Sequence, residues 1–243
     1  MTLMLIKLLA AHLAGDFTLQ SDRLCDMRYG GKFSGRLTAN CIHSLIQAAL
    51  SYIFIGIWDL WMLPIIIFIS HFIIDFLKTQ YGKRRLPDLL YDQAAHYIVL
   101  ILIWRFMLSG IAITDTPSKI SQTAWIIFTA YIAILTPTSI LVKSFMEYNS
   151  WVPCNPSLKG LPNAGKWIGF LERILILTFI FTENIEGIGF LLAAKSIFRF
   201  GELNRSKDLK VTEYVLIGTF LSFTAAILTG YLAAWTMTIG NEF

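Results

Sequence analysis

Charged residues are scarce in this sequence: Asp, Glu, Lys and Arg make up 15% of its 243 residues, whereas hydrophobic residues make up 56%. A soluble domain of this length cannot bury that much apolar surface in one core, so the composition excludes an ordinary water-soluble protein. Cysteine is also scarce, and Cys25, Cys41 and Cys154 have neither CxxC nor zinc-ribbon spacing, which predicts ordinary thiols. The net charge of +4 is mild and does not indicate a nucleic-acid partner. The sequence also lacks Walker loops, G-x-S-x-G elbows, H-E-x-x-H pairs and dinucleotide fingerprints.

Long hydrophobic segments are the main feature of the chain, and roughly 17 to 25 such residues cross a bilayer. A backbone in lipid must satisfy its own hydrogen bonds, and the alternation typical of barrel strands is absent, so we expect helices. We predict an all-α polytopic transmembrane helical bundle with about eight spans, of which the sixth and seventh either cross or re-enter. The approximate bounds are 2–19, 41–58, 60–79, 93–113, 122–145, 166–182, 185–200 and 212–238. The first segment lacks a cleavage site, so we expect a mature helix rather than a signal peptide.

The basic residues are distributed unevenly over the connections. Fifteen of the twenty lysines and arginines fall in the connections that follow spans one, three, five and seven, whereas the intervening connections hold only Lys119. The positive-inside rule then predicts that these four basic loops are cytoplasmic and that both termini lie outside.

All four histidines lie near an aspartate or at the end of a span. Three pairs are spaced i,i+4 and therefore share a helix face: His12/Asp16, His71/Asp75 and Asp92/His96. His43 opens the second span. Because spans one and three end where spans two and four begin, we expect all seven side chains to meet near the cytoplasmic surface.

A short motif occurs twice. The pattern H-x-x-x-D-F at 12–17 returns at 71–76, and each copy is followed by a basic loop and then by a histidine. The first four spans are therefore predicted to be two repeated helical hairpins. This divides the chain into a His/Asp-bearing four-helix membrane core at 1–113 and a C-terminal four-helix membrane region at 114–243.

Imidazole and carboxylate ligands together suit zinc, manganese or iron, and two such ions can clamp the reacting oxygens of a displacement. The predicted metal ligands are His12, Asp16, His43, His71, Asp75 and His96. Asp92 is expected to be a ligand or a general base. Lys78, one turn beyond Asp75, is expected to stabilise the charge that develops on a phosphate. A purely structural polar cluster is the alternative.

Ionisable residues also occur within the C-terminal spans. Glu172 and Arg173 lie in the sixth span and Lys195 in the seventh. Pairing of Glu172 with Lys195 or Arg199 would neutralise these charges, so a structural role is expected here.

Several stretches resemble a bacterial integral membrane family of unknown function, DUF3307. They are H-L-A-G-D-F-T-L-Q at 12–20, His43, H-F-I-I-D-F-L-K at 71–78, D-Q-A-A-H at 92–96, and three later stretches at 165–173, 193–200 and 213–219. The resemblance implies a bacterial inner membrane location. The His/Asp pattern is also similar in style to that of membrane-bound metal-dependent hydrolases.

We therefore expect a metal-dependent hydrolase that acts on a phosphoester, lipid-linked or otherwise phosphorylated, at the cytoplasmic face. Membrane lipid is the expected surrounding partner. Two alternatives stay open: a transporter of metal ions or protons, and a non-catalytic subunit that docks a cytoplasmic partner or a second copy of itself.

Overall fold

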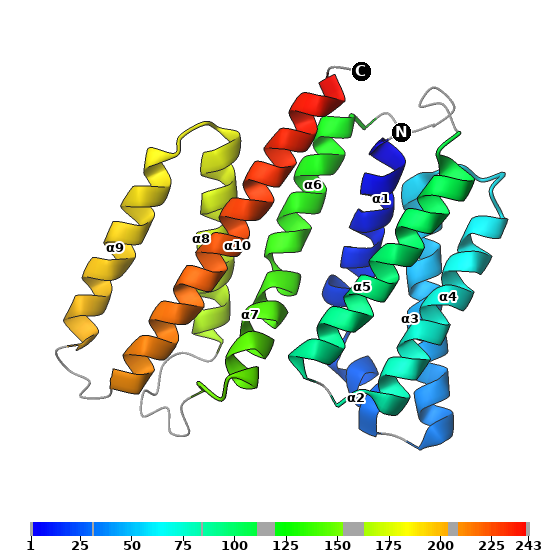
Figure 1. Ribbon diagram of the computed structural model, residues 1–243, viewed down its shortest axis with the longest axis horizontal. Coiled ribbons are helices and arrows are strands. Elements are labelled where there is room, and N and C mark those ends of the chain that lie inside the picture. Colours follow the sequence, from blue (N-terminus) through cyan, green and yellow to red (C-terminus); the bar gives the residue numbers. More distant parts are fainter. Residues whose placement is uncertain are drawn as a thin grey trace. The chain divides into compact units, whose positions relative to one another are not determined.

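The computed structural model describes residues 2–30, 32–83, 85–110, 120–152, 163–203 and 209–241, and its regular elements in these ranges are all helices (Figure 1). In chain order they are α1 (Thr2–Leu13), η1 (Ala14–Thr18, a π-helix), α2 (Asp22–Gly30), α3 (Phe33–Ile55), α4 (Met62–Tyr81), α5 (Leu86–Ile103), η2 (Trp104–Leu108, a π-helix), α6 (Gln122–Ile134), α7 (Thr136–Tyr148), α8 (Ala164–Phe181), α9 (Glu186–Leu203) and α10 (Leu209–Asn241). The predicted all-helical class is confirmed. Cys154, Arg84 and Lys119 lie outside the described residues.

Five helical segments of the described chain are long and apolar enough to cross a membrane, and a sixth is added if the bent pair of α1 and α2 counts as one span. The segment Gln122–Tyr148, made of α6 and α7 with a break at Leu135, is one of the five. The chain thus has the features of a multi-pass membrane protein.

Two compact units divide the chain, Met1–Ile132 and Ala133–Phe243. The boundary predicted from sequence, between 113 and 114, falls in a stretch outside the described residues. Most of α6 belongs to the N-terminal unit.

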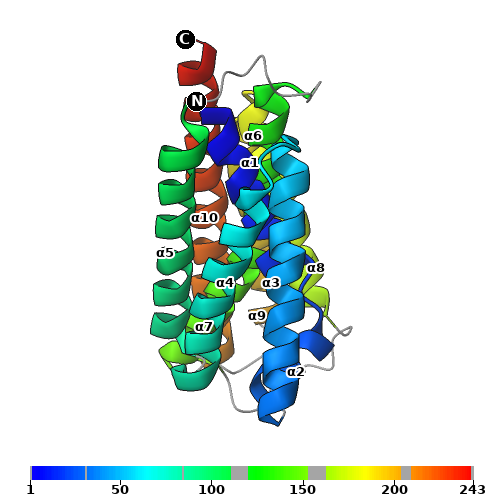
Figure 2. The ribbon, with the colours of Figure 1, turned by 90° about the vertical axis from the view of Figure 1, so that its right-hand side faces the viewer.

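Four helices form the bundle of the N-terminal unit. Each packs against two neighbours, in the order α1, α3, α4, α5 and back to α1. Helix α2 packs on α3, at the end of the bundle where α1 and α4 end and α3 and α5 begin (Figures 1 and 2). The predicted up-and-down order of the first four long helices is therefore present in this unit.

Helix α4 has its polar side inside and its apolar side outside. His71 and Asp75 are buried, whereas Ile65, Ile69 and Ile73 are each about half exposed. An outer surface of this kind is stable against lipid tails and unstable against water.

Two helices extend further than the hydropathy pattern predicted. Helix α3 begins at Phe33 rather than at residue 41, and α5 begins at Leu86 rather than at 93. The polar start of α3 is stabilised by tertiary packing, since Ala39 and Asn40 are completely buried. His43 therefore lies well inside a helix instead of at its beginning.

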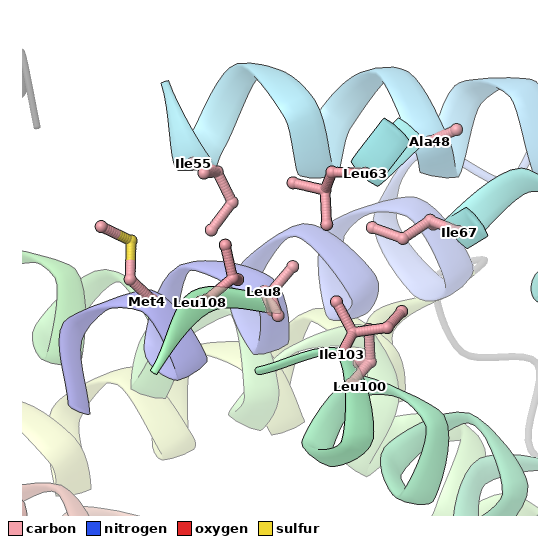
Figure 3. Close-up of a cluster of buried hydrophobic side chains, with 9 residues drawn as sticks. All are labelled: Met4, Leu8, Ala48, Ile55, Leu63, Ile67, Leu100, Ile103 and Leu108. Carbon is pink, nitrogen blue, oxygen red and sulfur yellow. The ribbon is translucent and has the colours of Figure 1, made fainter. Parts of the chain in front are cut away.

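The interior of the bundle is apolar toward the N-terminal end of α1. Nine buried side chains form this core: Met4, Leu8, Ala48, Ile55, Leu63, Ile67, Leu100, Ile103 and Leu108 (Figure 3). Along α1 and η1 the inward positions continue in steps of four from Met4 and Leu8 to His12 and Asp16. The same change from apolar to polar occurs on the other three helices, so the polar residues gather in one half of the bundle.

The C-terminal unit pairs its buried charges. Lys195 donates to Glu172 at 2.6 Å, which confirms the predicted neutralisation. Arg173 donates to the hydroxyls of Ser222 and Ser139, at 2.8 and 2.6 Å, and to a backbone carbonyl at the break between α6 and α7. These contacts join α8 to its neighbours and indicate a structural role.

Candidate metal centre

The predicted convergence of histidines and aspartates is present in the N-terminal unit. The buried members are His12, Asp16, His43, His71, Asp75, Asp92 and His96, each 7% exposed or less. They supply three overlapping triads whose ligand atoms lie within 4.8 Å of one another: His12/Asp16/His71, His43/His71/Asp75 and Asp16/Asp92/His96. Lys78 also joins the cluster and is its most exposed charged group, with 22% of its side chain accessible.

The two Nε2 atoms of His43 and His71 form the centre of the cluster, 3.1 Å apart. Oδ1 of Asp16 lies 3.2 Å from both nitrogens, and Oδ2 of Asp75 lies 3.3 Å from both. Adjacent tetrahedral ligands around an ion with bonds of about 2.0 Å are about 3.3 Å apart. Each of these two oxygens, taken with the two nitrogens, therefore has the spacing of three ligands around one divalent cation.

The three aspartates share one arrangement: one oxygen is held by a donor and the other has no hydrogen-bond partner. The held oxygens meet Gln93 Nε2 (for Asp16, at 3.2 Å), Arg28 Nη2 (for Asp75, at 2.7 Å) and Lys78 Nζ (for Asp92, at 2.5 Å). The unpartnered oxygens are Oδ1 of Asp16, Oδ2 of Asp75 and Oδ1 of Asp92. A buried carboxylate oxygen without a donor is costly, and a bound cation would satisfy it, as would a proton on Nε2 of His43 or His71 in the case of Asp16 and Asp75. The donors on the opposite oxygens resemble the outer shell that orients ligands in metal sites.

The hydrogen bonds of two histidines define their tautomers. Nδ1 of His96 lies 2.9 Å from the backbone carbonyl of Asp92, which can only accept, so the proton is on Nδ1. Nε2 of His96 is then an unprotonated nitrogen, and it has no partner. His12 differs, because its Nδ1 accepts from Gln47 at 3.3 Å and its Nε2 then donates to Gln93 at 3.2 Å. Both nitrogens of His12 thus contact amides, and His12 also belongs to the triad His12/Asp16/His71 at ligand spacing.

A local widening of the first helix positions Asp16. The backbone changes from α to π at Ala14, and the amide of Leu19 donates to the Ala14 carbonyl at 2.9 Å. Turns of this kind are frequent at functional sites. Gly15 is the residue that permits the close packing here, because a Cβ at this position would lie 1.8 Å from Oε1 of Gln47.

Arg28 is the most important residue of the site that the sequence analysis did not identify. The sequence places Arg28 in the basic connection after the first span, but α2 brings it back into the bundle, where it is 2% exposed. Its Nε donates to Oδ1 of Asn40 at 2.8 Å while its Nη2 pairs with Asp75. The signal was Ser21, an N-cap residue directly before α2 whose hydroxyl accepts from the amide of Leu24.

The charges of the cluster do not balance. Three carboxylates face two cations, Arg28 and Lys78, so one negative charge remains when the imidazoles are neutral. Buried charge without a partner is expensive, and either a proton on an imidazole that faces Asp16 and Asp75 or a bound cation would balance it.

The family described as "Protein of unknown function (DUF3307)" matches residues 4–143, which include the whole cluster. The three later stretches at 165–173, 193–200 and 213–219 lie outside this match. Searches of curated proteins and of solved structures gave no significant match.

Proposed function

The chain belongs to the DUF3307 family, whose function is unknown, and we propose that it is a metal-dependent membrane hydrolase that cleaves a phosphoester at the cytoplasmic face of the bacterial inner membrane. One observation carries the proposal. Unpartnered carboxylate oxygens of Asp16 and Asp75 lie at ligand spacing from the nitrogens of His43 and His71. This donor set fits zinc, manganese or iron(II).

A divalent cation in this set would polarise a phosphoryl oxygen and acidify a water molecule. Of the chain's own residues, Asp16 and Asp75 supply negative charge, and Arg28 orients Asp75 by holding its other oxygen. Two imidazoles and one or two carboxylates leave coordination positions for water and substrate, which a catalytic site requires.

Lys78 and Asp92 have the two remaining roles in the proposed reaction. Nζ of Lys78 is the most accessible cationic group of the cluster, so it can meet a phosphate that enters from this end and stabilise the charge that develops on it. Oδ1 of Asp92 is available as a ligand, or as the base that accepts a proton from the attacking water. In the reaction, water oxygen bonds to phosphorus, the ester P–O bond breaks, and the water's proton passes to the leaving alkoxide.

The membrane arrangement belongs to the same proposal. We take the chain to cross the bilayer about eight times with both termini outside, so that the cluster faces the cytoplasm, and the first four spans to be two repeated hairpins. The basic residues around this end would attract anionic headgroups, which favours a lipid-linked phosphate as substrate.

The apolar core of the bundle favours an enzyme over a transporter. The inward positions of α4 change from His71 and Asp75 to Ile67 and Leu63 toward the other end, and the neighbouring helices add further apolar side chains (Figure 3). The buried oxygens of Ser44, Gln47 and Ser51 continue the polar side of α3 beyond His43. A cation that crossed the bundle would then have to pass this packed layer and the buried cation of Lys7. A site that is open to one side of the membrane needs no such path.

The test is metal content and hydrolysis of the purified protein in detergent. Wild type should carry at least one zinc, manganese or iron ion per chain by mass spectrometry and should hydrolyse bis(p-nitrophenyl) phosphate or p-nitrophenyl phosphate. The double variant His71→Ala/Asp75→Ala should lose both properties. Ser70→Ala, on the same turn of α4 but half-buried, is the matched control and should keep them.

Other outcomes would favour the alternatives. Hydrolysis that persists in the double variant would refute the proposal. Bound metal without hydrolysis, together with metal uptake into proteoliposomes, would favour a transporter. A stoichiometric cytoplasmic partner that still binds the double variant, with no metal in either protein, would favour a docking subunit.

A further inference from the structure

We propose a second divalent-cation site in the same cluster, formed by Asp16, Asp92 and His96, so that Asp16 bridges two ions. The inference rests on the proposed function, because Asp16 also belongs to the first site. It extends that function by adding a second ion and by assigning Asp92 as a ligand.

His96 has the form of a metal ligand. Its proton is on Nδ1, which the backbone carbonyl of Asp92 accepts at 2.9 Å, so the lone pair of Nε2 is available. The residue is 3% exposed, and Nε2 has no hydrogen-bond partner. The first site, which consists of His43, His71, Asp16 and Asp75, does not include this nitrogen.

Asp92 offers the second ligand atom. Oδ2 accepts from Lys78 at 2.5 Å and from Gln93 at 3.1 Å, whereas Oδ1 is buried and unpartnered. Two orphaned polar atoms on one helix turn, one nitrogen and one oxygen, thus lie next to the first site.

Asp16 closes the triad. A carboxylate oxygen of Asp16, one of Asp92 and a nitrogen of His96 lie within 4.8 Å of one another. Adjacent ligands of one ion are about 3.3 Å apart, and opposite ligands at most about 4.4 Å, twice a bond of about 2.2 Å, so binding requires the three atoms to draw closer together. A carboxylate that bridges two cations is a common element of two-metal sites, in which the ions are about 3.5 to 4 Å apart.

The charge of the cluster sets the order of binding. One divalent cation changes the net charge from one negative to one positive, and a second would raise it to three positive. The second ion should therefore bind more weakly than the first, and an anion that approaches both ions should strengthen the binding of the second ion. Inorganic phosphate is the simplest such anion, and it has the chemistry of the proposed substrate.

The experiment is a Mn²⁺ titration of metal-stripped protein in detergent, with and without inorganic phosphate, followed by stoichiometry and electron paramagnetic resonance. Wild type should bind two Mn²⁺ per chain, with phosphate lowering the Kd of the second. The two ions should give an exchange-coupled spectrum. His96→Gln and Asp92→Asn should each retain one Mn²⁺ with the six-line signal of an isolated ion. Tyr97→Phe, next to His96, is the control and should keep two.

The outcomes separate this inference from the function on which it rests. One Mn²⁺ per chain in wild type, with an isolated-ion signal even in phosphate, would overturn the second site and leave the first intact. Two coupled ions in both His96→Gln and Asp92→Asn would overturn the ligand assignment. No Mn²⁺ in wild type would overturn both sites. Two variants with different chemistry guard against a folding defect in one of them.

Discussion

The ion pair of Arg28 and Asp75 gives the sharpest quantitative test of the site. The two groups are 2.7 Å apart and only 2% and 1% exposed, and Arg28 is also fixed by Asn40. Arg28→Met removes the cation and leaves the carboxylate buried without its partner. Breaking a buried pair in this way costs about 3–5 kcal/mol. At about 2–4 °C per kcal/mol for a protein of this size, the expected loss in Tm is about 6–20 °C.

The double variant separates loss of the pair from loss of packing. Asp75→Leu alone leaves the guanidinium of Arg28 buried without an anion and should also lower the free energy of unfolding by about 3–5 kcal/mol. In Arg28→Met/Asp75→Leu neither charge remains, and apolar replacement of a buried pair is often neutral or stabilising. The double variant should therefore be more stable than either single variant, with a coupling energy of several kcal/mol.

The assay is thermal unfolding in detergent with a chelator present, so that bound metal does not contribute to the measured stability. Arg23→Met, on the same helix but exposed, is the matched control and should leave Tm within about 2 °C of wild type, because surface changes are usually within ±0.5 kcal/mol. A drop for Arg28→Met as small as that of the control would refute the reasoning. So would a double variant that is as unstable as the sum of the two single ones.

Two further predictions concern a close approach and a second ion pair. Gly15→Ala should push Gln47 away from His12, because the new Cβ would lie 1.8 Å from Oε1 of Gln47. The affinity for the metal should then fall by about 10- to 100-fold, as it does when other residues that orient metal ligands are changed. Binding titration measures this, and an unchanged affinity would contradict it. Lys195→Met should lower the free energy of unfolding by about 1.5–3 kcal/mol through its lost bond to Glu172, without altering metal content. Thermal unfolding together with metal analysis checks both parts, and loss of metal would contradict the structural assignment.

Each of these two substitutions has a control in the chain. Gly35→Ala should be neutral for metal binding, because a Cβ at Gly35 meets nothing within 4 Å. Lys143→Met removes an exposed i,i+4 pair with Glu147, in which both side chains are more than half accessible, so its effect on stability should be small.

The gathering of the site residues could be predicted because it depends on helix periodicity and chain direction. The i,i+4 spacing of His71 and Asp75 puts both on one face, and the alternating direction of successive helices brings His12 and His96 to the same half of the bundle. Neither argument requires knowledge of side-chain contacts.

The partners of the cluster could not be predicted in the same way. Hydropathy assigned 20–40 to a loop, because its polar residues hide a short helix whose buried face is mainly Arg28. The π-turn at Ala14 has no clear sequence signal, since it depends on Gly15 packing against a side chain 32 positions later. The amides of Gln47 and Gln93 meet His12 only in three dimensions, so the sequence does not show which histidine nitrogens already have hydrogen-bond partners.

The two units show why burial of charge alone does not identify a functional site. In the C-terminal unit Glu172 meets Lys195, and Arg173 meets two hydroxyls and a carbonyl, so the contacts hold helices together and leave no carboxylate oxygen orphaned among the described residues. In the N-terminal unit three carboxylates each keep an unpartnered oxygen, and those of Asp16 and Asp75 lie at ligand spacing from imidazole nitrogens. Packing does not require this arrangement, because the other half of the same bundle is held mainly by apolar side chains, and its buried cation, Lys7, donates to the carbonyl of Ile55 at 3.2 Å. Among the described residues, buried carboxylate oxygens without a partner occur only in this cluster, which favours a positively charged ligand there, and the spacing of the atoms fits a divalent cation.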